Sequence, residues 1–257
     1  MPSPRLHLLA SAALTAAALL PVAGWSQITL KPDGQWRYLV SAGANATAGN
    51  SDTVNATARG EGVRMTDHDK LTFLGQIAYG SADGVTTTQR ASLGTQYNRD
   101  ISPRSFSFAS ADALRDKPSN IASRYSTAFG VGRHIVRTDQ NNFDISTGLG
   151  YSRDSYVTPT EVIGQTRDHY GRLELVLAEE SNHKVTSTTS LRQKVTVYPN
   201  LRDTGAWRAA LDSGVSVAMT QSLNLTAGFT YRFDSDPGAG LKKGDAAFVT
   251  GVSYRFD

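Results

Sequence analysis

The sequence contains no cysteine, which excludes disulfides, thiolate metal sites and a cysteine nucleophile. Charged residues make up only 19% of the chain, below the roughly 25% of soluble domains. The net charge of +3 is too small to indicate a nucleic-acid partner. Mean hydropathy is −0.32, which excludes a helical membrane bundle. Aromatic and β-branched residues are spread along the whole chain, so a disordered protein is also excluded.

The N-terminal region has the pattern of a secretory signal. Arg5 precedes an apolar run from Leu8 to Leu20, and small residues follow, ending at Ser26. This order of basic, apolar and small residues predicts a signal peptide over residues 1–26, cleaved before the mature protein of residues 27–257. A retained membrane helix is the alternative, but the apolar run is short for one.

From Gln35 onward, apolar side chains alternate with small or polar ones, in segments of about ten residues. In the segment from Leu223 to Phe233, for example, every odd-numbered position except Ala227 carries a large apolar side chain. Period two is typical of β-strands, because successive side chains point to opposite faces. Clusters of Gly, Asn, Asp, Ser and Pro separate about twelve such strands. We place one turn at Ser181–Lys184 and a long connection at Asp154–Asp168, where residues 155–165 are either loop or strand extension.

Alternation alone does not show which face points outward. A soluble barrel would bury the apolar face, whereas an outer-membrane barrel turns that face to lipid. The export signal, the charges on the polar face and aromatic residues near the strand ends favour lipid. We therefore predict an all-β, antiparallel up-and-down transmembrane barrel in the bacterial outer membrane. An exported soluble β-barrel that binds a small apolar ligand is the alternative.

The aromatic residues near the strand ends are expected to form two belts at the membrane interfaces. Phe106 and Phe108 are assigned to one of these belts, because they also lie near a strand end. The principal residues of the predicted aromatic girdle are Trp36, Tyr38, Tyr79, Tyr97, Tyr151, Trp207, Tyr231, Tyr254 and Phe256.

The polar face of the strands carries full charges and is expected to line the lumen. Hairpin geometry predicts Arg37 opposite Glu61, Glu174 close to Arg192, and Asp212 diagonal to Arg232. Such charges either form a salt-bridge lattice that fills the interior, or a narrow basic constriction that weakly favours anions. The predicted lumen residues are Arg37, Arg59, Glu61, Arg90, Arg124, Asp144, Arg172, Glu174, Arg192, Lys194, Arg208, Asp212, Arg232 and Arg255.

The sequence offers little for catalysis or metal binding. The histidines form no pair at metal-ligand spacing, and no G-x-S-x-G elbow is present. We therefore expect no enzyme activity, no cofactor and no metal. A barrel hydrolase using Asp154, Asp168 and His169 is kept as a third hypothesis, although two acids and a histidine in one loop are more often solvated loop residues.

The last strand suggests the partners of the chain. Phe248, Val252, Tyr254 and Phe256 recur at period two, and only Asp257 follows the final aromatic residue. This pattern resembles the C-terminal signal that the outer-membrane assembly machinery recognises; the alternative is that these residues form only a lipid-facing strand. We therefore expect that machinery and outer-membrane lipid as partners, and no nucleic acid.

Several short motifs occur in an order that resembles the salt-induced outer-membrane protein family, a domain of unknown function (number 481). They are Thr47-Ala48-Gly49-Asn50-Ser51-Asp52, Glu179-Glu180-Ser181, Tyr198-Pro199-Asn200, Asp234-Ser235-Asp236-Pro237, Lys242-Lys243-Gly244-Asp245 and Tyr254-Arg255-Phe256. The resemblance spans nearly the whole mature chain and implies an outer-membrane barrel. It implies no reaction, and is compatible with a structural or envelope-stress role.

Overall fold

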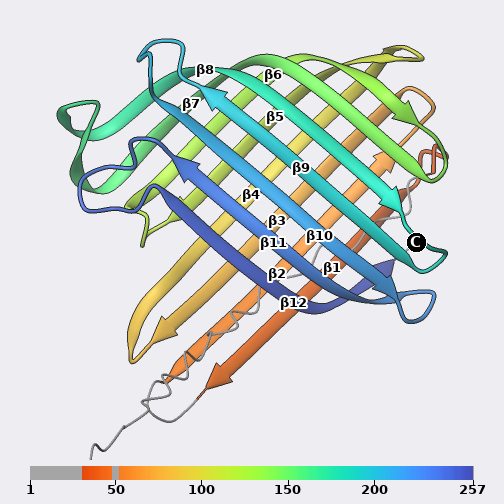
Figure 1. Ribbon diagram of the computed structural model, residues 1–257, viewed down its shortest axis with the longest axis horizontal. Coiled ribbons are helices and arrows are strands. Elements are labelled where there is room, and N and C mark those ends of the chain that lie inside the picture. The colour runs from red at the N-terminus through yellow and green to blue at the C-terminus, as the bar shows by residue number, and fades with distance from the viewer. Residues whose placement is uncertain (1–30, 48–51, 257) are drawn as a thin grey trace, which may run out of the picture.

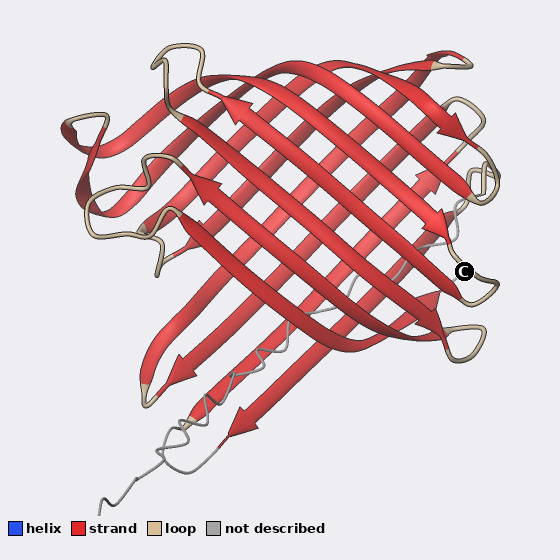
Figure 2. Cartoon of the chain, in the orientation of Figure 1, coloured by secondary structure: helices blue, strands red, loops and turns tan. Residues whose placement is uncertain are grey.

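A computed structural model describes residues 31–47 and 52–256. The signal peptide predicted at residues 1–26 lies outside this part of the chain. Twelve antiparallel strands close into one barrel, in which each strand pairs with its neighbours in sequence and β12 pairs with β1 (Figures 1 and 2). The described ranges contain no helix long and apolar enough to cross a membrane. The strands are β1 (Trp36–Thr47), β2 (Thr53–Met65), β3 (Asp69–Ala82), β4 (Val85–Ser102), β5 (Ser105–Asp116), β6 (Ile121–Arg137), β7 (Asn141–Val162), β8 (Gln165–Lys184), β9 (Thr189–Pro199), β10 (Trp207–Ala218), β11 (Leu223–Asp234) and β12 (Gly244–Phe256).

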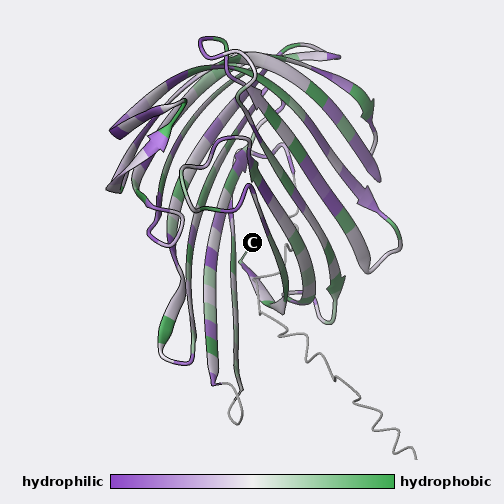
Figure 3. Cartoon of the chain, turned by 60° about the vertical axis from the view of Figure 1, so that its left-hand side comes forward, coloured by the Kyte–Doolittle hydropathy of each residue, from purple (hydrophilic) through white to green (hydrophobic). Residues whose placement is uncertain are grey.

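The apolar face of the sheet points outward. Leu225 and Val252 are 51% and 48% exposed, while their neighbours Thr226 and Ser253 are buried. Figure 3 shows the resulting alternation of hydrophobic and hydrophilic residues along the strands. A closed barrel pairs its first strand with its last, so the sheet has no open edge of unpaired strands. An apolar outer face is compatible with contact with the hydrocarbon of a membrane. The chain is therefore an outer-membrane β-barrel, and the soluble alternative is wrong because the apolar face of the sheet points outward.

The two ends of the barrel differ in their connections. Strand β1 begins and strand β12 ends at the same end of the barrel, which we call the terminal end. We call the opposite end the far end. The turns at the terminal end are short, as at residues 103–104 and 185–188. The far end carries the longest connections, at residues 200–206 and 235–243. Short turns face the periplasm in such barrels, so the far end faces the outside.

Of the two connections named above, the turn at residues 181–184 is wrong, and the long connection at residues 154–168 is strand for most of its length. Residues 155–165 were left open between loop and strand extension, and strand extension is what forms: β7 and β8 continue to a tight turn at Ile163 and Gly164, whose φ angles are +51° and +66°. Residues 181–184 lie within β8, and the β8–β9 turn follows at residues 185–188. Both segments are polar because they lie near the rims of the barrel, where polar residues are compatible with either strand or turn.

The assignment of Phe106 and Phe108 to a belt is also wrong. Both rings are buried inside the barrel, at 4% and 9% exposure. They lie opposite Gly132 and Gly130 of β6, and a Cβ at either glycine would overlap the facing ring. Because glycine has no side chain, Gly130 and Gly132 leave room for the two inward aromatic rings. The girdle residues named above lie on the outward face, with Trp36 stacked on Tyr38 at 6.0 Å between ring centroids.

The seam between β1 and β12 is short. Their register runs only from Tyr38–Phe256 to Ala42–Val252 among the described residues. Beyond Ala42 the two strands diverge toward the far end, as Figure 1 shows. Neighbours such as β10 and β11 pair along almost their whole length. The seam is therefore where the barrel has the fewest backbone hydrogen bonds.

Candidate functional site in the barrel lumen

The residues predicted to line the lumen lie on the inward face of the closed sheet. In each strand they alternate with outward apolar residues, and several contact residues of distant strands. Their contacts form three groups along the barrel. We call these the far-end network, the cross-lumen bridge and the terminal-end cluster.

The far-end network is centred on two carboxylates. Asp154 on β7 is 1% exposed and accepts hydrogen bonds from Arg124 Nε and Nη2, at 2.5 and 2.7 Å. Arg172 Nη1 donates to the same carboxylate at 2.9 Å and approaches Asp234 at 3.6 Å. One buried acid therefore neutralises guanidinium groups from two other strands.

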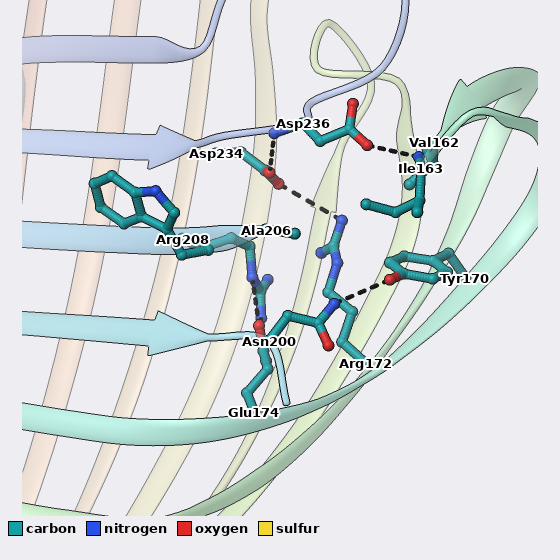
Figure 4. A pocket seen from close by; sticks show the side chains of 11 residues that line it. Val162, Ile163, Tyr170, Arg172, Glu174, Asn200, Ala206, Arg208, Asp234 and Asp236 are labelled. Atoms are coloured by element: carbon teal, nitrogen blue, oxygen red, sulfur yellow. Dashed lines mark hydrogen bonds and ion pairs between the residues drawn. The ribbon is translucent and has the colours of Figure 1, made fainter. Parts of the chain in front are cut away.

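The second carboxylate of the network is Glu174 on β8. Arg208 Nη2 approaches Glu174 Oε2 at 2.5 Å (Figure 4). Ser152 donates to the same oxygen at 3.0 Å. The Arg208 guanidinium also lies 5.4 Å from the centre of the Tyr198 ring. Each buried charge in this layer thus has a partner, as burial in a low dielectric requires. Two pairs with 2.6 and 3.3 Å separations lie nearby, Arg232–Asp212 and Arg90–Asp116.

Loops cover part of the far mouth above this network. The Ile163 N–H at the tip of the β7–β8 hairpin donates to Asp236 of the β11–β12 connection at 2.6 Å (Figure 4). Val162 beside it is 1% exposed, and the Asn200 amide donates to the Tyr170 hydroxyl at 2.9 Å. The cavity enclosed there is about 10 Å³, which is about the space of one water molecule.

The cross-lumen bridge connects opposite walls of the barrel. Arg192 on β9 lies 3.3 Å from Glu61 on β2, although four strands separate β9 from β2 on the shorter way round. Lys194 on β9 donates to Gln96 on β4, also a distant strand, at 3.2 Å. Glu180 accepts from Arg192 at 3.4 Å and lies 3.7 Å from Lys194. Arg59 lies 3.4 Å from Glu61.

The terminal-end cluster holds a histidine between two carboxylates. His134 Nδ1 lies 2.7 Å from Asp144 and its Nε2 lies 3.3 Å from Asp100, while Phe106 packs against the imidazole at 4.8 Å between ring centroids. Arg137 donates to Asp100 at 2.6 Å.

Arg37 at the start of β1 contacts an acid that precedes the strand. Its guanidinium lies 2.5 Å from Asp33 and holds the pKa of that carboxyl well below its usual range. The Arg37–Asp33 pair therefore lies at the terminal end, away from Glu61.

Two of the three predicted ion pairs are wrong. Arg37 lies opposite Val63, because the register of β1 and β2 is shifted by two residues from the predicted one. Arg192 lies opposite Asn182, because the β8–β9 turn is displaced to residues 185–188. The Asp212–Arg232 prediction is confirmed by a hydrogen bond of 2.6 Å.

Sequence reasoning missed several inward acids. Some of them were assigned to turns, although the period-two pattern extends to these positions. Asp154, for example, lies an even number of residues from Asp144 along β7, so both side chains point into the lumen. With these acids the inward face is closer to charge balance than predicted. The missed residues are Asp100, Asp112, Asp116, Asp154, Glu180 and Asp234.

The residues of the hydrolase hypothesis do not converge. Asp154 is held by two arginines inside the barrel, whereas Asp168 and His169 are exposed on β8. No group of three or more His, Cys, Asp or Glu side chains in the described ranges has an arrangement that could hold a metal ion.

The comparison with solved structures gives barrels of low sequence identity. The NanC porin is 12% identical with a TM-score of 0.47, covering 84% of this chain and 96% of that chain. The translocator domain of the autotransporter NalP from Neisseria meningitidis is 15% identical with a TM-score of 0.46, covering 86% and 88%. An anion-selective porin from Comamonas acidovorans is 7% identical with a TM-score of 0.38, covering 86% and 99%. These likenesses concern the fold alone.

No curated protein matches the sequence. A family model described as a protein of unknown function, DUF481, matches residues 40–256, which include all or part of every strand. The chain therefore belongs to the DUF481 family.

Proposed function

We propose that this protein is a non-catalytic, narrow outer-membrane pore with a weak preference for anions. The observation that carries the proposal is the cross-lumen bridge, in which Arg192 reaches Glu61 and Lys194 reaches Gln96. These contacts divide the lumen into smaller passages. On the wall opposite β9, Asp112 points inward yet is exposed, beside the small residue Gly94. Water therefore reaches the lumen next to the bridge.

The weak anion preference follows from the charges at the bridge. Around the bridge, the positive charges of Arg59, Lys70, Arg192 and Lys194 face the negative charges of Glu61, Asp112 and Glu180, which leaves one positive charge in excess. Selectivity is set where the passage is narrowest, because ions there lose part of their hydration and approach the wall charges closely. The single positive excess favours anions only slightly.

A structural role without conduction is the second candidate, because the contact between Ile163 and Asp236 covers part of the far mouth. The buried ion pairs of the far-end network would then stiffen a closed barrel. Such a rigid, closed barrel is compatible with an envelope-stress protein that has no transport function.

Conductance in planar lipid bilayers separates the two candidates. We expect small single-channel currents from the wild type and several-fold larger currents when Arg192→Ala and Lys194→Ala are combined, because both crossings are lost. Arg232→Ala is the matched control. It removes a lumen cation whose partner, Asp212, is on the adjacent strand and does not cross the lumen.

Reversal potentials under a salt gradient test the selectivity. We expect a slightly anion-selective wild type and a cation-selective form of the combined variant, in which two cations and three acids remain around the bridge. Absence of channel activity in both proteins would support the structural role. A cation-selective wild type would contradict the charge assignment at the bridge.

A further inference from the structure

A shallow groove of about 690 Å³ lies on the outward face of β1 to β6. Its volume is within the range of about 300–1,000 Å³ that small-ligand sites occupy. The walls are large exposed side chains, namely Val40, Ile77, Leu93 and Tyr125. The floor between them consists of small residues, namely Ala58, Gly60, Gly75, Ala91 and Ala113.

Strand register shows that the groove is continuous. Gly75 lies opposite Leu93, Leu93 opposite Ala113, and Ala113 opposite Tyr125. From Val40 on β1 the groove therefore runs directly across the strands to Tyr125, near the far-end start of β6. It ends near the far-end aromatic residues, which mark the headgroup level of the membrane. The groove thus runs along the lipid-facing surface up to one interface, a path that a single acyl chain can follow.

Positive charge lies at the interfacial end of the groove. Arg115 lines the groove, and Arg153 lies directly opposite Tyr125 on the next strand. Both arginines are exposed, and neither has an ion pair or side-chain hydrogen bond to a described residue. An arginine on the lipid face is costly near mid-bilayer and is accommodated where its guanidinium reaches anionic headgroups. Lys117 adds a third exposed cation in the adjacent turn.

We propose that this groove binds lipid A, the phosphorylated and multiply acylated glucosamine lipid of the outer leaflet. One acyl chain lies over the floor of alanines and glycines, and Arg115 and Arg153 bind a phosphate. Guanidinium groups suit this role because they donate paired hydrogen bonds to phosphate oxygens. Lipid A fits better than a phospholipid, because the groove opens at the far end and several cations face its several phosphate charges.

The test is native mass spectrometry of the full chain in detergent, with added lipid A, phosphatidylglycerol or phosphatidylcholine. We expect one lipid A molecule to remain bound, with at least tenfold weaker retention of either phospholipid. Arg115→Ala combined with Arg153→Ala should reduce lipid A retention at least tenfold. Arg133→Ala is the matched control, because Arg133 is an exposed, outward arginine on β6 near the terminal end.

A second variant tests the groove separately from its charges. Ala91→Trp fills the floor while both arginines remain, and we expect a similar loss of lipid A. The heat-dependent gel mobility of a folded barrel shows whether each variant is folded. Equal retention of phosphatidylglycerol would overturn the assignment to lipid A. An equal loss in Arg133→Ala, or full retention in Arg115→Ala with Arg153→Ala, would overturn the site itself.

Discussion

At the scale of single residues, Asp154 is the acid whose loss should destabilise the barrel most. Its carboxylate accepts from Arg124 and Arg172 and is 1% exposed. Asp154→Ala leaves two buried guanidinium groups with fewer partners, and breaking a buried pair in this way costs about 3–5 kcal/mol. Urea unfolding in detergent, followed by gel mobility, should show a loss of that size.

The control for this prediction is Asp168→Ala. Asp168 is exposed near the tip of the β7–β8 hairpin, and surface substitutions of this kind change stability by about 0.5 kcal/mol or less. A similar unfolding midpoint for both variants would mean that the far-end network contributes little to stability.

The sequence predicts which residues of each strand point into the lumen, but it does not predict which groups their side chains contact. Alternation assigns Arg192 and Glu61 to the polar face, because one face of every strand must meet lipid. Their contact joins residues 131 positions apart and depends on how the closed barrel brings opposite walls together. No local pattern encodes that distance, so the cross-lumen bridge was not predicted.

At the scale of the elements, two hairpins show what limits prediction from sequence. Asp83-Gly84 is a familiar two-residue turn signal, and both residues have positive φ. Ile163-Gly164 adopts the same conformation with a β-branched residue, which favours positive φ least. The first turn can be recognised from its residue types, whereas the second lies in residues 155–165, for which loop and strand extension were both left open.

The same hairpin provides an element-scale prediction. Asp236→Ala removes the acceptor of the Ile163 N–H and should free the hairpin tip from the β11–β12 connection. We expect trypsin to cleave after Arg167 several-fold faster, because cleavage requires local opening of the chain. Lys242→Ala in the same connection is the control. Equal cleavage rates in wild type and Asp236→Ala would show that this hydrogen bond does not hold the hairpin.

At the scale of the whole molecule, the barrel and its strand number follow from the sequence, whereas its weakest point does not. The repeat of period two and the turns between strands predict about twelve strands. Closure joins the first and last strands, and their register depends on the stagger accumulated around the barrel. The seam pairs only over Tyr38–Ala42 as a result. We therefore expect unfolding to begin between β1 and β12.

A cross-link at the seam tests this expectation. Ser41 and Ser253 lie opposite each other, are 2% and 1% exposed, and have hydroxyl groups without a hydrogen-bond partner among the described residues. Opposite residues of antiparallel strands lie within disulfide range, and the chain has no other cysteine. Because the bond closes nearly the whole chain into one loop, Ser41→Cys with Ser253→Cys should stabilise the oxidised barrel by up to about 5 kcal/mol.

The control cross-link joins Ser190 and Ser216, which lie opposite each other on β9 and β10. This bond closes a much shorter loop and should contribute up to about 3.5 kcal/mol. If unfolding begins at the seam, the Ser41–Ser253 bond should also slow the unfolding rate far more than the control bond, because it must remain closed while the first strands separate. Urea unfolding kinetics with and without reductant measure both effects. Equal slowing by the two bonds would place the start of unfolding elsewhere in the barrel.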